Sequence, residues 1–403
     1  MRIEEAPPGR VPAAPKNIPE LHRLLRETIV PRLGELAACR SVAELHSHPT
    51  WLQLGPLIQE VLETPELIDY SAGPAPPRNR YRFVAWNIER GIHLDAQIEA
   101  LTTHPYLRET DVLLLTETDV GMARSGNRAV SQTIARELGF HHVFMPCYLS
   151  LVKGSGLEYF VEGENELALH GNAIVSRYPF GRIWGIPLPN GHDKMSRREK
   201  RVGSQTAVAA EIRLPGLPLT AVSIHLDAQS SQEHRRRQMR KVLDSLPPGC
   251  PAVLGGDWNT STYNSSRALH AILGFALRVL MGVDHVIREH YLKPYQWFER
   301  RLFRMLAAEG FDYRSPNVPG ELTASYDVSD VRATESLREW VPEWCFAFIR
   351  WALRNHGGVC PLKLDWFATR GVRAASPVVL HEFRNGRAAP LSDHDPVGVD
   401  ILA

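Results

Sequence analysis

The chain has 403 residues, of which 44% are hydrophobic and 23% charged, and its formal net charge is +1. This composition is typical of an ordinary soluble globular protein, and the length is too great for one small domain. A protein that grips many phosphates of a long nucleic acid usually carries a basic excess. The near-neutral balance therefore argues against non-specific polyanion binding by the whole chain, although a local basic patch stays open.

Cysteine usage and the N-terminal residues bear on compartment. The five cysteines are scattered without a CxxC pair, which favours reduced, mostly buried thiols over a zinc site or a disulfide framework. The first thirty residues lack the apolar stretch of a signal peptide. No apolar run reaches ~18 residues, so no spanning helix is expected. We therefore expect a cytoplasmic protein.

The first part of the chain reads as a helical extension. Residues 1–16 are rich in proline, and apolar residues then recur at helical spacing from Ile18 to about Asp69. The segment SAGPAPPR at 71–78 has the proline and glycine content of a linker. The sequence thus predicts an N-terminal helical extension and linker over 1–78.

From residue 79 onward the pattern changes to short apolar runs bounded by turns, which are typical of strands. Eight strands are predicted, at residues 81–87, 111–117, 171–176, 206–212, 219–225, 251–257, 364–369 and 397–402. A helix is expected over 232–246, with Ser230 and Glu233 as a capping box and with Arg235–Arg237 on a solvated face.

This order predicts an α+β sandwich, in which two packed, mainly antiparallel sheets are flanked by helices. Residues 79–403 would form one domain of this kind. A mostly helical insertion would interrupt it at about 265–358.

Polar side chains recur where the predicted strands end. Asn87 and Glu89 follow RFVAW, and Asp257 and Asn259 follow PAVLGG. The two residues of each pair are two positions apart, so their side chains lie on the same face of the sheet if the strand continues. The other strand-end positions are Glu117, His225, Asp365, Asp393 and His394. Carboxylates at the ends of buried strands are costly unless something compensates them, and a divalent cation is the obvious candidate. Carboxylate and amide oxygens suit Mg²⁺ or Mn²⁺ better than zinc.

Seven short strings carry a family resemblance. WNIERG, LLLTETD, GNAIVSRYP, SIHLD, GGDWN, LDWF and SDHDP follow one another in this order. Together they resemble the endonuclease/exonuclease/phosphatase superfamily, which includes deoxyribonuclease I, apurinic endonucleases, neutral sphingomyelinases and inositol polyphosphate phosphatases. The resemblance covers roughly 81–403 apart from the insertion, and it implies a metal-dependent phosphoesterase.

The resemblance also implies roles for the strand-end residues. Glu117 would be the principal metal ligand, with Asp393 a further ligand and with Asn87 and Glu89 in the metal and phosphate site. Asp257 would orient or deprotonate the attacking water, and Asn259 would hydrogen-bond the phosphate. His225 would donate to a phosphoryl oxygen. His394, held by Asp365, would stabilise the pentavalent phosphorane.

Two further residues are candidates for substrate contacts. Asn172 either reaches the site or only hydrogen-bonds neighbouring loops. Arg201 ends the basic loop SRREKR at 196–201, which either docks a substrate phosphate or is an ordinary charged loop.

Several functions stay open at this level. A nuclease would need a basic, aromatic-bearing groove. An enzyme for phospholipids or other small esters would use the apolar helical insertion as a lid or lipid contact, whereas the simpler interpretation is that those helices pack on each other and on the sheets. A non-catalytic binding module on the same scaffold would have lost a carboxylate or histidine, and none is missing.

Overall fold

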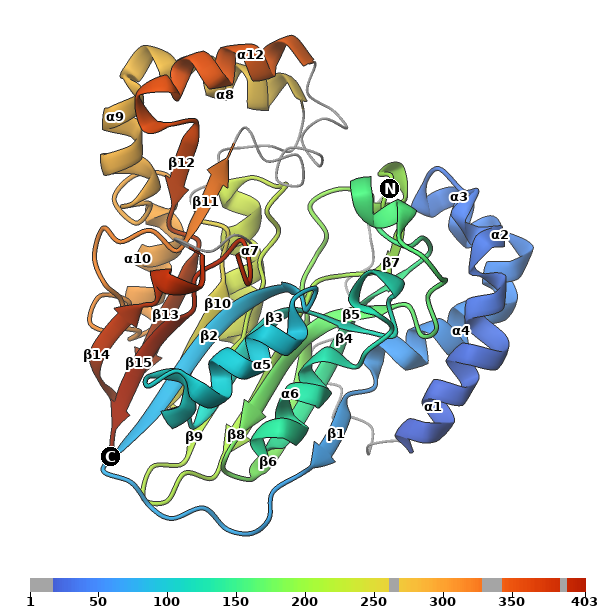
Figure 1. Ribbon diagram of the computed structural model, residues 1–403, viewed down its shortest axis with the longest axis horizontal. Helices are drawn as coiled ribbons and strands as arrows, with labels where there is room; N and C mark the ends of the chain where they lie inside the picture. The colour runs from blue at the N-terminus through green and yellow to red at the C-terminus, as the bar shows by residue number, and fades with distance from the viewer. Residues whose placement is uncertain (1–16, 261–267, 328–342, 385–389) are drawn as a thin grey trace.

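The computed structural model describes residues 17–260, 268–327, 343–384 and 390–403. Two large sheets pack face to face (Figure 1). The first has the order β1 (Glu66–Asp69), β4 (His141–Ser150), β5 (Leu169–Ser176), β3 (Val112–Val120), β2 (Arg80–Arg90), β15 (Val397–Leu402) and β14 (Arg373–Val379), with β7 (Arg201–Gly203) paired to β4. The second has the order β13 (Asp365–Arg370), β10 (Ala252–Asp257), β9 (Leu219–Ser223), β8 (Thr206–Ile212) and β6 (Phe180–Pro187).

Strand pairing within the two sheets is antiparallel except at one position in each. Strands β2 and β3 run parallel in the first sheet, and β9 and β10 run parallel in the second. The predicted sandwich of mainly antiparallel sheets with flanking helices is therefore confirmed.

Three apolar layers hold the sandwich together. Residues such as Phe83, Leu114, Val253 and Phe367 form the core between the sheets. The outer face of the first sheet is covered by the N-terminal helices and by α5 (Leu94–Thr103) and α6 (Val130–Leu138). The outer face of the second sheet is covered by α7 (Gln232–Asp244) and α10 (Arg300–Ala308).

The N-terminal region is tied to the first sheet. Its helical turns are α1 (Ile18–Leu24), η1 (Leu25–Ile29), η2 (Val30–Arg32), α2 (Leu33–Ala37), α3 (Val42–Ser47) and α4 (Pro49–Glu63). The prediction that the helical pattern continues to about Asp69 is wrong, because Glu66–Asp69 is strand β1 paired with β4. Pro65 explains the change, since a residue before proline is disfavoured in the helical conformation and Thr64 is extended.

Helix α7 differs from its prediction in its N-cap and in the burial of Arg235. Its N-cap is Ser231, whose side chain accepts from the His234 amide, whereas the Ser230 hydroxyl donates to the Asp227 carbonyl. Arg235 is not on a solvated face: its guanidinium is fully buried and donates from Nε to Glu299 Oε1 at 2.8 Å.

The insertion divides into two parts. Helix α10 belongs to the core of the second sheet. The remaining elements, which we call the helical arm, are α8 (Ala268–Met281), α9 (Val283–His285), η7 (Val286–Tyr291), β11 (Ala324–Asp327), α12 (Glu343–Ala352) and β12 (Val359–Leu362). Strands β11 and β12 pair with each other, and Val286, Phe346 and Leu353 belong to a small apolar cluster of the arm's own. The short turn η8 (Arg354–His356) connects α12 and β12 within the arm, and the short helical turns elsewhere are η3 (Leu107–Glu109), η4 (Ala123–Ser125), η5 (Gly156–Phe160), η6 (Lys194–Ser196) and η9 (His381–Phe383).

No single helix among the described residues is long and apolar enough to cross a bilayer. The segments Leu269–Met281 and Val283–Tyr291 together meet the length and composition criteria, but they are bent by 102°.

A buried histidine makes stability depend on pH. His142 is 1% exposed, its Nε2 lies 3.0 Å from the Ser131 hydroxyl, and burial lowers its pKa to about 3. Below pH ~6.5 the His142 side chain is therefore protonated in the unfolded chain but stays neutral in the folded chain. The free energy of unfolding falls as the pH drops from ~6.5 towards the pKa of the folded state.

We expect this group alone to cost about 2 kcal/mol of unfolding free energy between about pH 7.5 and about pH 5. His142→Gln should show a correspondingly flatter dependence in urea unfolding monitored by circular dichroism. Equal slopes for the variant and the wild type would contradict this assignment.

Candidate active site

Nine of the predicted site residues lie together at one edge of the sandwich, and both sheets contribute. Strands β2 and β3 and the segment before β15 place Asn87, Glu89, Glu117, Asp393 and His394. The ends of β9 and β10 and the start of β13 place His225, Asp257, Asn259 and Asp365. Asp257 and Asp365 are cross-strand partners in the β10–β13 pair.

Asn87 connects the two sheets at the centre of the site. Its Nδ2 donates to Glu117 Oε1 and to Asp257 Oδ2, each at 3.2 Å, and its Oδ1 accepts from the Glu89 amide at 3.1 Å. The Glu117 and Asp257 carboxylates are 140 residues apart in the chain, yet both accept a hydrogen bond from the same amide group of Asn87.

Glu89 and Asp393 lie together beside this centre. The Asp393 amide donates to Glu89 Oε2 at 3.2 Å. The Ser392 hydroxyl donates to the Asn87 carbonyl at 2.6 Å and accepts from the His394 amide at 3.1 Å. The SDHDP segment is therefore bonded directly to the end of β2.

Asp257 is surrounded by potential proton donors. Its Oδ1 accepts from the Asn259 amide at 2.9 Å, and its Oδ2 lies 3.4 Å from His225 Nε2. His225 Nε2 is also 3.9 Å from Glu117 Oε1. The Asn259 side-chain amide donates to Asp257 Oδ2 at 3.2 Å and to the Leu226 carbonyl at 2.9 Å, which fixes its orientation.

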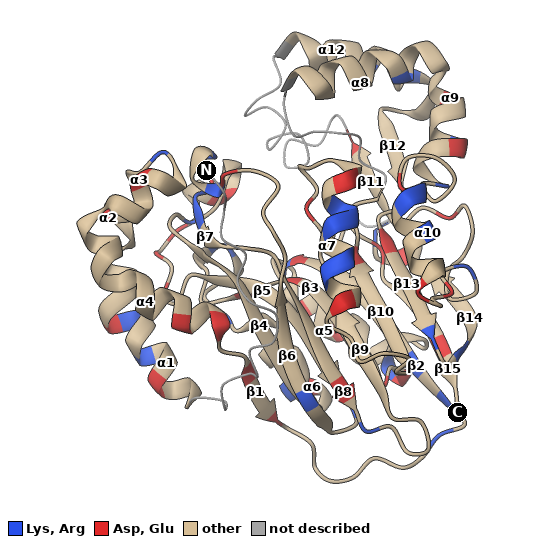
Figure 2. Ribbon diagram, turned by 180° about the vertical axis from the view of Figure 1, so that it is seen from behind, with Lys and Arg blue, Asp and Glu red and all other residues tan. Residues whose placement is uncertain are grey.

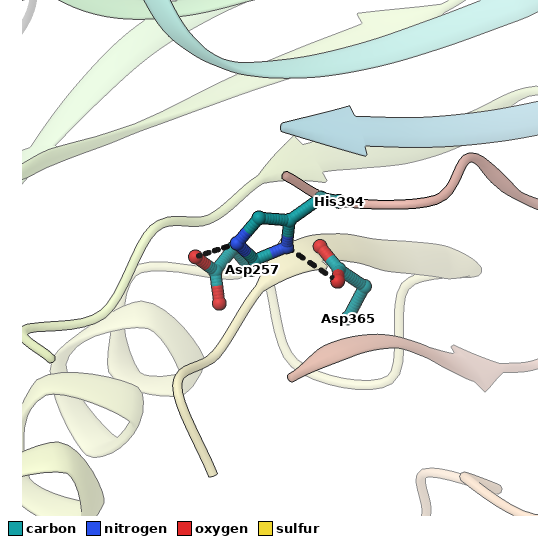
Figure 3. A group of neighbouring side chains, drawn as sticks. All are labelled: Asp257, Asp365 and His394. Carbon is teal, nitrogen blue, oxygen red and sulfur yellow. Dashed lines mark hydrogen bonds and ion pairs between the residues drawn. The ribbon is translucent and has the colours of Figure 1, made fainter. Parts of the chain in front are cut away.

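His394 and Asp365 form a buried dyad (Figure 3). His394 Nδ1 is 2.7 Å from Asp365 Oδ2, and its Nε2 is 3.8 Å from Asp257 Oδ2. These three residues offer ligand atoms within 4.8 Å of one another, so the group has the spacing of a metal site. Because the short bond to Asp365 occupies Nδ1, we interpret the group as an oriented imidazole between two carboxylates.

The backbone of the site is locally strained. Glu89, Arg90, Glu117 and Asn259 have φ values of 46°, 64°, 54° and 52°, in the left-handed region that side chains other than glycine rarely adopt. Such conformations cost of the order of 1–3 kcal/mol each and cluster at functional sites. Gly256 has φ +130°, and a Cβ there would lie 2.3 Å from the Ile224 carbonyl, so glycine lets β10 approach the end of β9.

Burial and neighbouring charges shift the protonation of the site. Burial raises the pKa of the Asp257 carboxyl, and His394 and His225 offset only part of this effect. Burial would also raise the pKa of Glu117, but Arg90 and His225 outweigh it, so that carboxyl has a pKa well below its ordinary value.

The pKa values of the two histidines are shifted in opposite directions. Burial lowers the pKa of His225 in spite of Asp257 and Glu117. Burial opposes the charged form of His394 as well, but Asp365 and Asp257 dominate and raise its pKa well above the usual range. The site therefore favours a cationic His394 beside a neutral His225.

Beside the nine residues lies an ion-pair network that no sequence pattern predicts. Arg90 Nε is 3.9 Å from Glu117 Oε2, and Arg90 Nη1 is 3.2 Å from Glu158 Oε1. Arg124 Nη1 then pairs with Glu158 at 3.1 Å and with Glu199 at 2.8 Å. The WNIERG string contains Arg90, but nothing in the local pattern distinguishes Glu158 or Glu199 from ordinary loop carboxylates.

The side chains of the two predicted substrate-contacting residues bond to residues outside the nine. The Asn172 amide is buried and donates to the Thr206 carbonyl at 2.9 Å and to Cys147 Sγ at 3.4 Å. Arg201 Nη2 pairs with Glu199 Oε2 at 3.2 Å, and its guanidinium lies 4.9 Å from the centre of the Tyr148 ring. The ion-pair network links Arg201 to Glu117 through Glu199, Arg124, Glu158 and Arg90.

The donor set fits a divalent cation. Glu117 is held as a carboxylate and its side chain is 20% exposed, so an ion can reach it. Asn87 is hydrogen-bonded to this carboxylate, and backbone amide bonds link Glu89 to Asn87 and Asp393 to Glu89, so further oxygen donors come from the same part of the site. Mg²⁺ and Mn²⁺ prefer such oxygen ligands and retain water.

Comparison with known proteins identifies the family. The model of the endonuclease/exonuclease/phosphatase family matches residues 84–394, and the chain belongs to this family. No curated protein matches the chain by sequence.

The solved structures found to be similar are distant relatives in sequence. An endonuclease/exonuclease/phosphatase from Beutenbergia cavernae is 17% identical, with a TM-score of 0.46 over 81% of this chain and 72% of its own. An AP endonuclease from Archaeoglobus fulgidus is 16% identical, with a TM-score of 0.43 over 79% of this chain and 98% of its own. A 3′-5′ exonuclease from Neisseria meningitidis is 17% identical, with a TM-score of 0.43 over 80% and 100%.

Proposed function

We propose that the protein is a divalent-metal-dependent phosphoesterase that hydrolyses a phosphodiester or phosphomonoester with an activated water. The observation that carries this proposal is the convergence of Asp257, the His394–Asp365 dyad and Glu117 across the two sheets. A buried base, an oriented cation and an accessible carboxylate are the parts that such a hydrolysis requires.

Glu117, with Asn87, Glu89 and Asp393, would hold Mg²⁺ or Mn²⁺, which supplies Lewis acidity and charge neutralisation at the phosphoryl group. Asp257 would accept the proton of the attacking water, because burial brings its pKa closer to neutrality. Asn259 keeps this carboxylate in place through its backbone amide.

The remaining groups would stabilise the charge that develops on the phosphoryl oxygens. Cationic His394, oriented by Asp365, would donate from Nε2 to the pentavalent phosphorane. His225 would donate to a second phosphoryl oxygen. Arg201 would contact a more distal phosphate, whereas the Asn172 amide already serves internal hydrogen bonds and would act on the substrate only indirectly.

Several classes of phosphate ester are compatible with this site. Nucleic acid, a phospholipid headgroup and a small ester all present a phosphate that this arrangement would accept. A non-catalytic binding module is the second candidate, and the intact base, dyad and carboxylate disfavour it.

The proposal is tested by a hydrolysis screen with saturating Mg²⁺ or Mn²⁺ against oligonucleotides, phospholipids, phosphoinositides and simple aryl diesters. Metal-dependent cleavage of at least one class supports the proposal. If the protein binds the metal but cleaves none of these esters, the binding-module account replaces it.

Glu117→Gln tests the assignment of the metal ligand. Loss of the carboxylate charge should raise the Mn²⁺ concentration needed for half-maximal activity by at least about 10-fold. Mutation of residues that only hydrogen-bond to a metal ligand already lowers metal affinity by about this factor, and a ligand should matter at least as much. Excess Mn²⁺ should restore part of the rate. Glu166→Gln, at a side chain that is 54% exposed, is the matched control and should leave the metal titration unchanged. An unchanged titration for Glu117→Gln would remove this residue from the metal site.

A further inference from the structure

An apolar helix of the arm has no buried side chain among those that the structure describes. Helix α8 has the sequence ALHAILGFALRVLM, yet none of its residues from 269 to 281 is buried. Leu269, Leu273, Leu277 and Leu280 are exposed, and Leu280 is 85% exposed. A helix that is apolar on nearly all sides is expected inside a core or in contact with lipid, and a fourteen-residue helix is marginal without packing.

The neighbouring helix extends this apolar surface with aromatic side chains. Phe275 of α8 and Phe348 of α12 are in edge contact, with ring centroids 5.6 Å apart. Trp344, Phe348 and Trp351 are exposed at helical spacing along α12, and Trp344 is 65% exposed. The two helices lie side by side at the tip of the molecule, away from the sheets (Figure 1). Large apolar side chains are therefore exposed together on two adjacent helices, whereas a monomer normally exposes such residues singly.

The charges on this surface are almost all positive. Helix α8 carries Arg278 and no acidic residue, and α12 carries Arg350, with Arg354 just after it; Glu343 at the start of α12 is the one acidic residue in these two helices. Figure 2 draws both helices mostly in the tan of uncharged residues. The Arg278 guanidinium bonds within the arm, to the Gly274 carbonyl and to the Tyr291 hydroxyl.

We propose that the exposed faces of α8 and α12 dock the protein on an anionic lipid bilayer. Leucine and tryptophan side chains beside arginines match the boundary between acyl chains and headgroups, where indoles and cationic ends are favourable. A symmetric pairing of two copies through the same faces would instead bring their arginines together, with Glu343 as the one acidic residue that each copy's two helices carry.

The arm is anchored at the catalytic edge. The Trp258 amide donates to the Leu364 carbonyl at 2.9 Å, and the Thr260 hydroxyl donates to the Lys363 carbonyl at the same distance. These bonds hold together the two chain ends between which the insertion runs. Ala324 at the start of β11 forms a bridge with His394 itself. Docking of the arm would therefore fix the position of the candidate active site relative to the membrane.

Vesicle binding by the full chain tests the proposal. We expect cosedimentation with phosphatidylcholine vesicles that contain about one third phosphatidylglycerol, weaker binding to pure phosphatidylcholine, and a blue shift of tryptophan emission on binding. Leu273→Ser combined with Leu277→Ser should lower the binding constant at least about 10-fold, since each leucine contributes several buried carbons. Trp344→Ser combined with Trp351→Ser changes α12 and leaves α8 intact. It should also reduce binding, which would show that the effect of the α8 variants is not merely the unfolding of α8.

Matched controls come from exposed apolar residues outside the arm. Leu52→Ser on α4 and Phe160→Ser on η5 change side chains that are 68% and 79% exposed, and they should leave vesicle binding unchanged. Asp257→Asn should bind vesicles as the wild type does, so a failure of the hydrolysis proposal stays separate from a failure of docking.

Three results would overturn the proposal. The first is the absence of binding to the anionic vesicles. The second is binding that the arm variants do not weaken. The third is a lipid-free dimer, seen by light scattering, that the α8 variants dissociate, since the apolar faces would then serve self-association.

Discussion

Asp257→Asn is expected to lower kcat by about 10²–10⁴-fold with the best substrate found, while Tm stays close to that of the wild type. Asparagine keeps the size of the side chain and the acceptor for the Asn259 amide, but it cannot take a proton from water. The loss should therefore fall on kcat more than on KM. Steady-state kinetics at saturating metal, together with a thermal melt, measure both.

Asp244→Asn makes the same chemical change on α7, where the carboxylate is 63% exposed. It should leave kcat and KM unchanged. Near-normal turnover by Asp257→Asn would show that Asp257 is not the base and would shift that role to another group of the site.

His394→Ala should cost a similar factor of about 10²–10⁴ in kcat, because it removes an oriented cation from the charge that develops on the phosphoryl group. The loss should be partly restored by free imidazole, for which the deleted side chain leaves room between Asp365 and Asp257. Initial rates with and without imidazole measure this effect.

The same imidazole should not raise the rate of the wild type or of Asp257→Asn, which serve as the controls. Turnover by His394→Ala within a few-fold of the wild type would contradict a role for the dyad in catalysis.

The strands that carry the site were predictable because each is a regular apolar run that ends in a polar residue. Residues 81–87, 111–117 and 251–257 all lie largely within strands of the structure. The positions of Asn87, Glu117 and Asp257 at one sheet edge then follow from the ordered strings and the family resemblance. Their mutual hydrogen bonds do not, because these depend on how two sheets pack.

Two of the strands that were missed, β4 and β14, have breaks in their pattern. Strand β4 contains Pro146, and its register with β5 shifts between Pro146 and Tyr148. Strand β14 contains Pro377 next to a similar irregularity in its pairing with β15. Proline within an apolar run normally argues against a strand, and at a bulge it is tolerated because the missing amide is not needed there.

Charged residues were predicted least well where their partners are distant in sequence. Arg235 sits in a run of three arginines, which usually marks a solvated face, yet its partner Glu299 lies 64 residues further on. The pairing of Arg124 with Glu199 spans 75 residues. Buried ion pairs of this kind depend on tertiary packing, and no local pattern reports them.

Metal-dependent hydrolysis is the central claim, and the rate of ester cleavage as a function of added Mn²⁺ or Mg²⁺ tests it most directly. The protein is first freed of metal with a chelator, and each ester class is then assayed with the wild type and with Asp257→Asn in parallel. We expect no turnover without metal, saturable activation of the wild type towards at least one ester, and a loss of about 10²–10⁴-fold in the variant at saturating metal. Turnover that is independent of metal, or equal in the two proteins, would contradict the proposed mechanism.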